Sequence, residues 1–328
     1  MEFGVLLGDL PASVGPREHL DRLLRQVDAA QRNGFTTIAI GQHFLYGDIR
    51  WLQPIPVLAR LAAELAAQVR LATTVLVVPL HHPVVLAEEL ATLDVVTGGR
   101  LSVGLGVGYR REEFHQLGIP FAERLTRFEE GLQIMRLLWT EPAVTFHGRH
   151  WSLDDARPHI APVQRPTPPV WIGATTTAGV RRSARLGDAW PIGPRMPVPD
   201  IERRLAVYRA ERAALGLATG RQPIRREIVV RATREQARRD FTAMTGARYH
   251  AYADRDRTVY ADGDGSDTAL LGTPDEVHAG LHDLATRLPL GPVIVRAQWP
   301  GMDDEAVRRY LDEVGEHVVR PLAATARS

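Results

Sequence analysis

The strongest constraint on the fold is a strand-then-helix alternation that repeats along almost the whole chain. Short runs of β-branched and apolar residues alternate with longer segments whose apolar residues recur at the i, i+3, i+4, i+7 spacing of an amphipathic helix. The expected strands are Phe3–Leu7, Thr36–Ile40, Arg70–Val78, Leu101–Gly106, Val170–Gly173, Ala189–Ile192, Glu227–Ala232 and Val293–Gln298. The expected helices are Glu18–Asn33, Ile55–Ala67, Pro83–Val96, Glu123–Trp139, Ala178–Leu186, Ile201–Leu215, one after Thr233, Asp275–Arg287 and Asp304–Val319.

Strands that are each followed by a helix predict an α/β fold in which a parallel sheet closes as a (β/α)8 TIM barrel. We expect a single domain over residues 1–328 with two insertions at its C-terminal face, at about 140–168 and about 241–271. The first insertion contains a predicted hairpin, Val144–Leu153, and a proline-rich loop. A doubly wound fold is less favoured because it needs a domain boundary, and the proline-rich break at 158–169 is short.

Composition excludes several chemistries. The chain has 0 cysteines, and all 40 of its lysine-or-arginine positions are arginine, which excludes thiolate nucleophiles, lysine Schiff bases and the P-loop. The net charge is +1 with interleaved signs, so we expect no nucleic-acid partner and expect pairs such as Arg225–Arg226 on solvated faces. No apolar run approaches the roughly 20 residues of a membrane span, and no signal-peptide pattern is present. We therefore expect a cytoplasmic protein without a membrane or metal partner.

The active site of such a barrel lies where the strands end and the following loops begin. This rule selects polar, aromatic and glycine residues behind five of the predicted strands. The candidates are Gln42, His43, His81, the Gly104–Tyr109 run, Gly173–Thr177, Arg296, Gln298 and Trp299.

Several candidates have two interpretations. The glycines of 104–108 follow a strand as in a dinucleotide loop, but their G-x-G-x-G spacing favours close approach of the backbone to a flat ring ligand. Gly173–Thr177 begins a helix with three hydroxyl groups, and fits either a phosphate site or a plain threonine N-cap. His43 is either a general acid/base or a structural histidine. His81 and His82 point apart on any regular element, so we expect no metal site there.

Several motifs together resemble one known family. They are Pro79-Leu-His-His-Pro83, Glu88-Glu-Leu-Ala-Thr-Leu-Asp94, Gly98-Gly-Arg100 through Gly108, Glu113-Phe114, Pro120-Phe-Ala-Glu-Arg124, Pro169-Val-Trp-Ile-Gly173, Arg185-Leu-Gly-Asp-Ala-Trp190, Gly272-Thr-Pro-Asp-Glu276 and Arg296-Ala-Gln-Trp-Pro-Gly301. Over roughly residues 1–320 the chain resembles the luciferase-like flavin-dependent monooxygenases, the bacterial luciferase superfamily, which includes deazaflavin-using relatives.

The resemblance implies a reduced-flavin site above the carboxyl ends of the strands. His43 matches a histidine that faces the flavin and substrate, and Thr74–Val75 match a step that often carries a non-prolyl cis peptide. The other cofactor positions implied are Gly106, Val107, Gly108, Gly173, Ala174, Thr175 and Thr176, with Arg124 or Arg127 at the phosphate. The side chains expected to face the substrate are Gln42, Tyr46, His81, Tyr109 and Trp299.

The resemblance also implies reduced FMN as cofactor, used with O2 to oxygenate a small cyclic or aromatic substrate. A barrel takes about 250 residues, which leaves no room for a reductase domain, so a separate flavin reductase is expected as partner. A coenzyme F420-dependent oxidoreductase and a non-catalytic flavin-binding protein are the alternatives, and a homodimer is compatible with each. Gln42 stands where some deazaflavin enzymes carry an acidic residue, which favours FMN.

The second insertion, 241–271, is expected to be a mobile substrate cap. It carries Tyr249, His250, Tyr252 and Tyr260, followed by the glycine-rich turn Asp262–Asp267. Long structureless stretches inside a compact domain are uncommon and are usually functional lids or disordered. Aromatic side chains in a lid suit a cyclic or aromatic substrate.

Overall fold

The structure is a computed structural model that describes residues 1–47, 49–253, 265–299 and 301–324, without the side chains of 247–253 and 324. Within these residues the main sheet has eight strands, and all of its ladders are parallel. These strands are β1 (Phe3–Leu7), β3 (Thr37–Ile40), β5 (Arg70–Thr73), β6 (Leu76–Val77), β7 (Leu101–Gly106), β10 (Val170–Ile172), β11 (Gln222–Arg225) and β14 (Leu290–Arg296). The hydrogen-bonded order is β10-β7-β5-β3-β1-β14-β11, and β6 pairs with β7.

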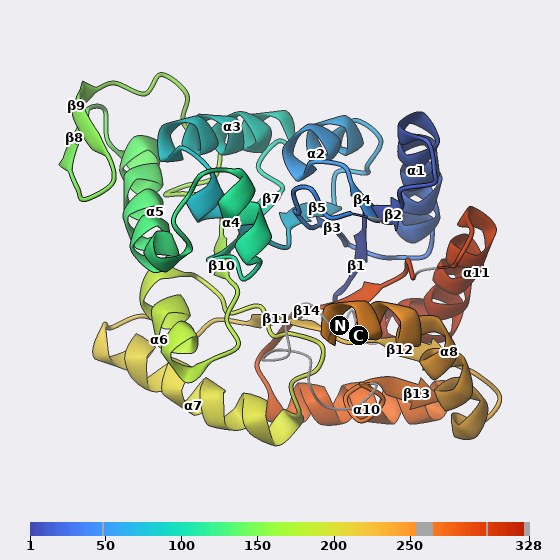
Figure 1. Ribbon diagram of the computed structural model, residues 1–328. Coiled ribbons are helices and arrows are strands. Elements are labelled where there is room, and N and C mark those ends of the chain that lie inside the picture. The colour runs from blue at the N-terminus through green and yellow to red at the C-terminus, as the bar shows by residue number, and fades with distance from the viewer. Residues whose placement is uncertain (48, 254–264, 300, 325–328) are drawn as a thin grey trace.

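Helices are arranged around the outside of these strands (Figure 1). The longer helices are α1 (Pro16–Arg32), α2 (Pro54–Ala62), α3 (Pro83–Val96), α5 (Arg124–Thr140), α6 (Thr177–Leu186), α7 (Val198–Ala214), α8 (Arg234–Ala253), α10 (Pro274–Arg287) and α11 (Asp304–Val314). The short ones are α4 (Arg111–Gln116), α12 (Arg320–Ala324), the 3-10 turns η1 (Val78–Leu80) and η2 (Phe121–Glu123), and the π turn η3 (Gly315–Val319). Among the described helices, none has the length and apolar character needed to cross a membrane.

Three two-stranded sheets lie outside the main sheet. They are β2 (Asp9–Pro11) with β4 (Ile49–Trp51), β8 (Val144–His147) with β9 (Ser152–Ala156), and β12 (Ile228–Val230) with β13 (Leu270–Gly272). The β8–β9 pair is antiparallel and lies beyond α5 in Figure 1, where the sequence predicts a hairpin. The β2–β4 pair was not expected from the sequence.

The core has two layers because alternate strand residues face opposite sides. On β1, Phe3, Val5 and Leu7 belong to the large cluster between strands and helices. Leu6 faces the other way and packs in a smaller cluster with Ala39, Ala72 and Ile294 and with residues of β10 and the segment after α6. This inner face carries the alanines Ala39 and Ala72 together with larger side chains.

The expected closed barrel is only partly present, because the main sheet is open between β10 and β11. The segment 189–192, expected as the sixth strand, makes two isolated parallel bridges, Trp171–Ala189 and Ile192–Ile224, instead of a ladder. Pro191 lies inside this segment and has no N–H group to donate, which explains why a continuous ladder does not form. The described architecture is an α/β fold with an open parallel sheet.

The expected seventh strand is wrong in position. The strand that pairs with β14 is β11, at Gln222–Arg225, whereas the expected segment contains β12 and pairs with β13 in a separate sheet. The apolar run lies in β12, whereas β11 reads Gln-Pro-Ile-Arg, and its proline and polar residues weaken its strand pattern. The sequence signal therefore favours the wrong one of two neighbouring segments.

The expected cap is helical at its start. Helix α8 continues through Phe241 to Ala253, so this part is not a structureless loop. Residues 254–264 lie outside the described part, and so do the side chains of Tyr249, His250 and Tyr252; the turn Asp262–Asp267 lies partly outside it. The cap therefore remains a prediction.

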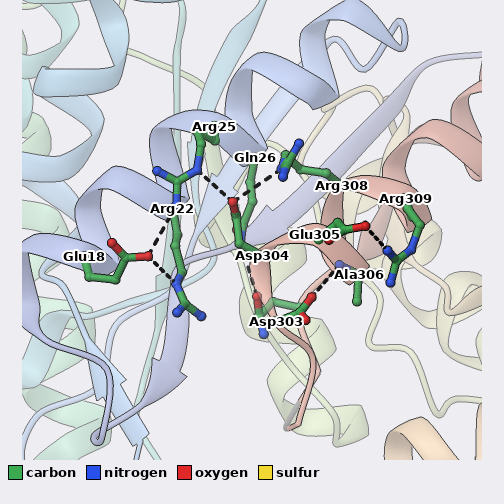
Figure 2. Close-up of polar contacts among 11 residues, drawn as sticks. Glu18, Arg22, Arg25, Gln26, Asp303, Asp304, Glu305, Ala306, Arg308 and Arg309 are labelled. Carbon is green, nitrogen blue, oxygen red and sulfur yellow. Dashed lines mark hydrogen bonds and ion pairs between the residues drawn. The ribbon is translucent and has the colours of Figure 1, made fainter.

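Helices α1 and α11 are joined by a charged network (Figure 2). Asp304 accepts hydrogen bonds from Arg25 Nε at 2.7 Å, Gln26 Nε2 at 3.3 Å and Arg308 Nε at 3.3 Å. Gln26 also donates to Gln298 Oε1 at 3.3 Å. This contact connects the network to the loop that follows β14, where candidate substrate residues lie.

Candidate functional site

A cavity of about 150 Å³ lies at the carboxyl ends of the main-sheet strands. Its walls include Thr74 and Val75 after β5, Gly104 on β7, Gly173 after β10 and Arg225 at the end of β11. The inner-face residues Leu6, Trp171 and Ile294 also contact it. This is the position at which parallel α/β folds bind ligands.

The expected third strand is interrupted at the cavity. The bond Thr74–Val75 is a non-prolyl cis peptide and separates β5 from β6, as the resemblance implies. The Thr74 hydroxyl is buried and has no hydrogen-bond partner among the described residues. A Cβ atom on Gly106 would lie 2.6 Å from Val75 Cγ2, so only glycine fits there without a shift. The cavity wall therefore contains a hydroxyl group without a partner among the described residues.

The turn after β7 contains the predicted residues Gly106, Val107 and Gly108. Gly108 has a φ of +84°, in the left-handed region that favours glycine. A Cβ atom there would also lie 2.7 Å from Val77 Cγ1 and 2.8 Å from the Phe114 ring. The turn is packed tightly between β6 and α4.

The Gly173–Thr177 segment contains the threonine N-cap that was one of its two interpretations. Thr176 is the N-cap of α6, and its hydroxyl accepts from Gly179 N at 3.1 Å. Gly173 N donates to Leu105 O at 2.9 Å, and Ala174 O accepts from Trp190 Nε1 at 2.9 Å, which fix the loop beside the cavity. Thr176 is thus a structural cap, and the loop places Gly173 in the cavity wall.

The structure separates the two arginines of α5. Arg127 Nε forms an ion pair with Glu123 at 2.9 Å. Arg124 donates to Phe121 O and stacks over the Phe121 ring at 3.9 Å, with no carboxylate partner among the described residues. Burial lowers the pKa of Arg124, with a further decrease from the neighbouring cations Arg111 and Arg182. Arg124 is therefore the better placed of the two for an anion.

His43 contacts a buried carboxylate. Its Nδ1 lies 2.8 Å from Glu113 Oε1, and the side chains are 12% and 2% exposed. The same oxygen accepts from Phe44 N at 3.0 Å and Arg110 Nη1 at 3.2 Å. Glu113 lies on α4, so the loops after β3 and β7 meet at this histidine.

Aromatic rings surround His43. The ring of His43 lies 4.6 Å from Tyr46, 4.8 Å from Trp51 and 6.1 Å from Tyr109, measured between centroids. Tyr46 packs in one hydrophobic cluster with Trp299 and with Phe241 at the start of the expected cap. The structure thus brings Tyr46, Tyr109 and Trp299 to the same region as His43.

Gln42 and His81 instead connect neighbouring loops. Gln42 Oε1 accepts from Val77 N at 3.0 Å and lies 3.1 Å from His81 Nε2. Gln42 Nε2 donates to Gln53 Oε1 at 3.2 Å, and Gln53 Nε2 donates to His43 O at 3.1 Å. Burial lowers the pKa of His81 to about 4, so this ring is neutral near pH 7. Both expected substrate residues therefore have partners within the protein.

Arg226 contradicts the expectation of a solvated arginine pair. It is 1% exposed, and it donates to Gly193 O at 3.1 Å, Pro194 O at 3.2 Å and Met196 O at 2.9 Å. Burial lowers its pKa to about 10. Because Gly193 and Pro194 line the cavity, Arg226 fixes one cavity wall.

Several site residues were missed from the sequence. Glu113 belongs to a motif that was recognised, but its pairing with His43 was not predicted. Asp9 was missed as well; it forms a second buried pair at the strand ends with the candidate Arg296, with Nη1–Oδ1 at 2.8 Å and both side chains 3% exposed. A carboxylate directly behind β1 and an arginine at the end of β14 are the signals that point to it, since these strands are neighbours.

Residues 1–289 match the family described as luciferase-like monooxygenase. The chain belongs to the luciferase-like monooxygenase family. Membership confirms the resemblance predicted from the motifs.

Three similar proteins illustrate the range of the luciferase-like monooxygenase family. An FMNH(2)-dependent dimethylsulfone monooxygenase from Pseudomonas putida is 31% identical over 159 residues, 48% of this chain and 43% of that protein. An F420-dependent glucose-6-phosphate dehydrogenase from Intrasporangium calvum is 32% identical over 184 residues, 54% of this chain and 53% of that protein. The crystal structure of monooxygenase RslO1 from Streptomyces bottropensis has a TM-score of 0.82 at 28% identity and covers 98% of this chain and 100% of that one. The chain spans about half the length of the curated relatives it matches.

Proposed function

We propose that the chain is a flavin-dependent monooxygenase that receives reduced FMN from a separate reductase. It uses O2 to oxygenate a small cyclic or aromatic organic substrate. The observation that carries this proposal is the strand-end cavity, whose wall combines the Thr74 hydroxyl, which has no partner among the described residues, with Gly173 and with apolar side chains. Binding sites for small organic ligands are likewise mostly apolar and carry a few placed polar groups.

The residues around the cavity fit a flavin ring. Gly173 lines the cavity and carries no Cβ atom, so a planar group can approach the backbone there, whereas the missing Cβ atom of Gly104 makes room for the Thr73 carbonyl of the neighbouring strand. Thr74 Oγ1 offers a hydroxyl for a ring heteroatom, and Val75 offers an apolar surface. We propose that the segment 189–192 completes the barrel at the open side of the main sheet, between β10 and β11. The two isolated bridges that this segment makes support the proposal.

The flavin phosphate is proposed to bind at the start of α6. The first N–H groups of a helix are oriented outward and attract anions. The residues that would hold the phosphate there are Ala174, Thr175 and Thr176, with Arg124 as the cation. Arg124 is close enough to Arg182 of α6 for the two charges to repel, which places it beside this helix.

A bound reduced flavin supplies the two electrons that O2 chemistry requires. The chain's own contribution is shape, water exclusion and proton handling. Tyr46, Trp51 and Tyr109 form an apolar surround for His43, and Trp299 adds to it through Tyr46. His43 is proposed to move a proton to or from the substrate as general acid/base. The expected cap, with Phe241 packed beside Tyr46 and Trp299, is proposed to close over this surround.

A second candidate function is a coenzyme F420-dependent oxidoreductase. The specific observation in its favour is the 32% identity to an F420-dependent dehydrogenase. Two features disfavour this second candidate. The Gln42 side chain is already hydrogen-bonded to Val77 and His81, and the sequence contains no lysine to bind a polyanionic cofactor tail.

Titration of the purified protein with FMN and, separately, with coenzyme F420 distinguishes these functions. Binding is followed by the absorbance and fluorescence of each cofactor in oxidised and reduced form. We expect FMN to bind at least about tenfold more tightly, a free-energy difference of about 1.4 kcal/mol. Tighter binding of coenzyme F420 supports the second candidate, and binding of neither overturns both.

A further inference from the structure

His43 and three other side chains form a closed circuit of contacts. His43 Nδ1 contacts Glu113 at 2.8 Å, and Glu113 contacts Arg110 at 3.2 Å. The Arg110 guanidinium lies 4.2 Å from the Tyr46 ring centre, and the Tyr46 ring lies 4.6 Å from the His43 ring. His43 and Tyr46 follow β3, whereas Arg110 and Glu113 follow β7. The circuit therefore connects two separate loops at the His43 imidazole.

The donors around Glu113 determine the position of the imidazole proton. Glu113 Oε1 accepts from the Phe44 N–H and from the Arg110 guanidinium, and neither group is able to accept a hydrogen bond. An oxygen that accepts from two such donors, one of them cationic, is not the site of a proton. This oxygen is therefore an acceptor only, so the His43 atom 2.8 Å away must be a donor. Neutral His43 therefore carries its proton on Nδ1, and Nε2 has a lone pair.

We propose that Glu113 is a positioning residue that holds His43 in the Nδ1–H tautomer and directs Nε2 as the proton acceptor. This inference rests on the proposed acid/base role of His43. When Nε2 takes a proton from a substrate group, the ring becomes an imidazolium whose Nδ1–H remains bonded to Glu113. Glu113 stabilises that charge without itself being protonated. The Arg110 contact holds the carboxylate beside His43, and the stacking of Arg110 on Tyr46 holds the guanidinium in place.

The neighbouring residue Glu112 provides a matched control. Both glutamates lie on α4 and line one surface groove of about 530 Å³, but Glu112 is exposed whereas Glu113 is buried. Glu112→Gln removes the same charge from the same helix without touching His43. Glu113→Gln removes the charge at the histidine, and Glu113→Asp keeps the charge but shortens its reach.

The direct test is NMR of histidine labelled with nitrogen-15, in protein without added cofactor. The His43 signal is assigned by its loss in His43→Asn. We expect neutral His43 to be protonated at Nδ1 in the wild type and in Glu112→Gln, and to become a mixture of tautomers in Glu113→Gln. A wild-type His43 protonated at Nε2 in its neutral form overturns the proposal, and this result requires no Glu113 variant to fold.

The kinetic test uses a panel of cyclic ketones and phenols supplied with reduced FMN and O2. On the panel member with the fastest turnover, we expect Glu113→Gln to lower kcat by about 10–100-fold with little change in KM, the size typical of removing a carboxylate that orients a working histidine. We expect Glu113→Asp to recover part of the loss. An unchanged kcat with a wild-type tautomer overturns the proposal. Failure of the wild type to bind FMN overturns the proposed function instead, and leaves the tautomer result to decide the role of Glu113.

Discussion

Gly106→Ala tests whether the backbone after β5 and the turn after β7 form the cofactor surface. The added methyl group would lie 2.6 Å from Val75 Cγ2, roughly 1 Å inside the 3.5–4.0 Å separation of carbon atoms in contact. Valine is restricted at χ1, so relief requires Val75 to move into the cavity that it lines. Overpacking of this kind costs about 1–3 kcal/mol.

If the bound flavin occupies the space into which Val75 moves, the free-energy cost of the overpacking weakens FMN binding. A cost of about 1–3 kcal/mol corresponds to a Kd for FMN raised about 5- to 150-fold. The assay is fluorescence titration of FMN with wild type, Gly106→Ala, Val75→Ala and the double variant. Because Val75→Ala removes Cγ2, we expect Gly106→Ala to have little effect on Kd in that background. Equal FMN affinity of Gly106→Ala and wild type, with no coupling to Val75, would refute the assignment of this surface.

Three further perturbations test other parts of the structure. Ala174→Asp places a carboxylate at the start of α6 and is expected to weaken FMN binding, measured by the same titration. Ala174→Ser is expected to leave FMN binding nearly unchanged. Equal effects of the two variants would show that the phosphate does not bind at this loop. Asp304→Ala removes the acceptor shared by Arg25, Gln26 and Arg308 (Figure 2) and is expected to lower the free energy of unfolding, measured in urea, by about 1–2 kcal/mol. The control is Glu305→Ala, which removes an exposed ion pair with Arg309 and is expected to change this free energy by less than about 0.5 kcal/mol. Burial lowers the pKa of His81 from 6.5 to about 4, so on acidification the unfolded chain binds a proton at His81 before the folded chain does, and the free energy of unfolding is expected to fall as the pH decreases from about 6.5 to about 4. His81→Gln is expected to lose this part of the pH dependence of stability. An unchanged pH dependence in His81→Gln would contradict the burial argument.

Elements with a strong local pattern could be predicted from the sequence. Phe3–Leu7, Pro83–Val96 and Leu101–Gly106 are found with the predicted boundaries, and the helix predicted over Asp275–Arg287 is present and begins with a capping box of Thr273 and Glu276. In each case the signal is local, either an uninterrupted apolar run or a cap with its first turn.

Elements that depend on partners far along the chain could not be predicted in the same way. β11 contains Pro223 and the segment 189–192 contains Pro191, and local propensity does not reveal that both lie beside main-sheet strands. Glu113 is 70 positions from His43, and only the meeting of two strand-end loops brings them to 2.8 Å. Gln42 and His81 were correctly located at strand ends, but their mutual contact became evident only in three dimensions.

Supplying the enzyme with reduced FMN and isotopically heavy O2 tests the central claim most directly. The protein is incubated with the panel of cyclic ketones and phenols and a generic flavin reductase, and the products are analysed by mass spectrometry. The account predicts a product that contains one heavy oxygen atom and whose formation depends on His43. A product formed without heavy oxygen, by loss or gain of hydrogen alone, would contradict it.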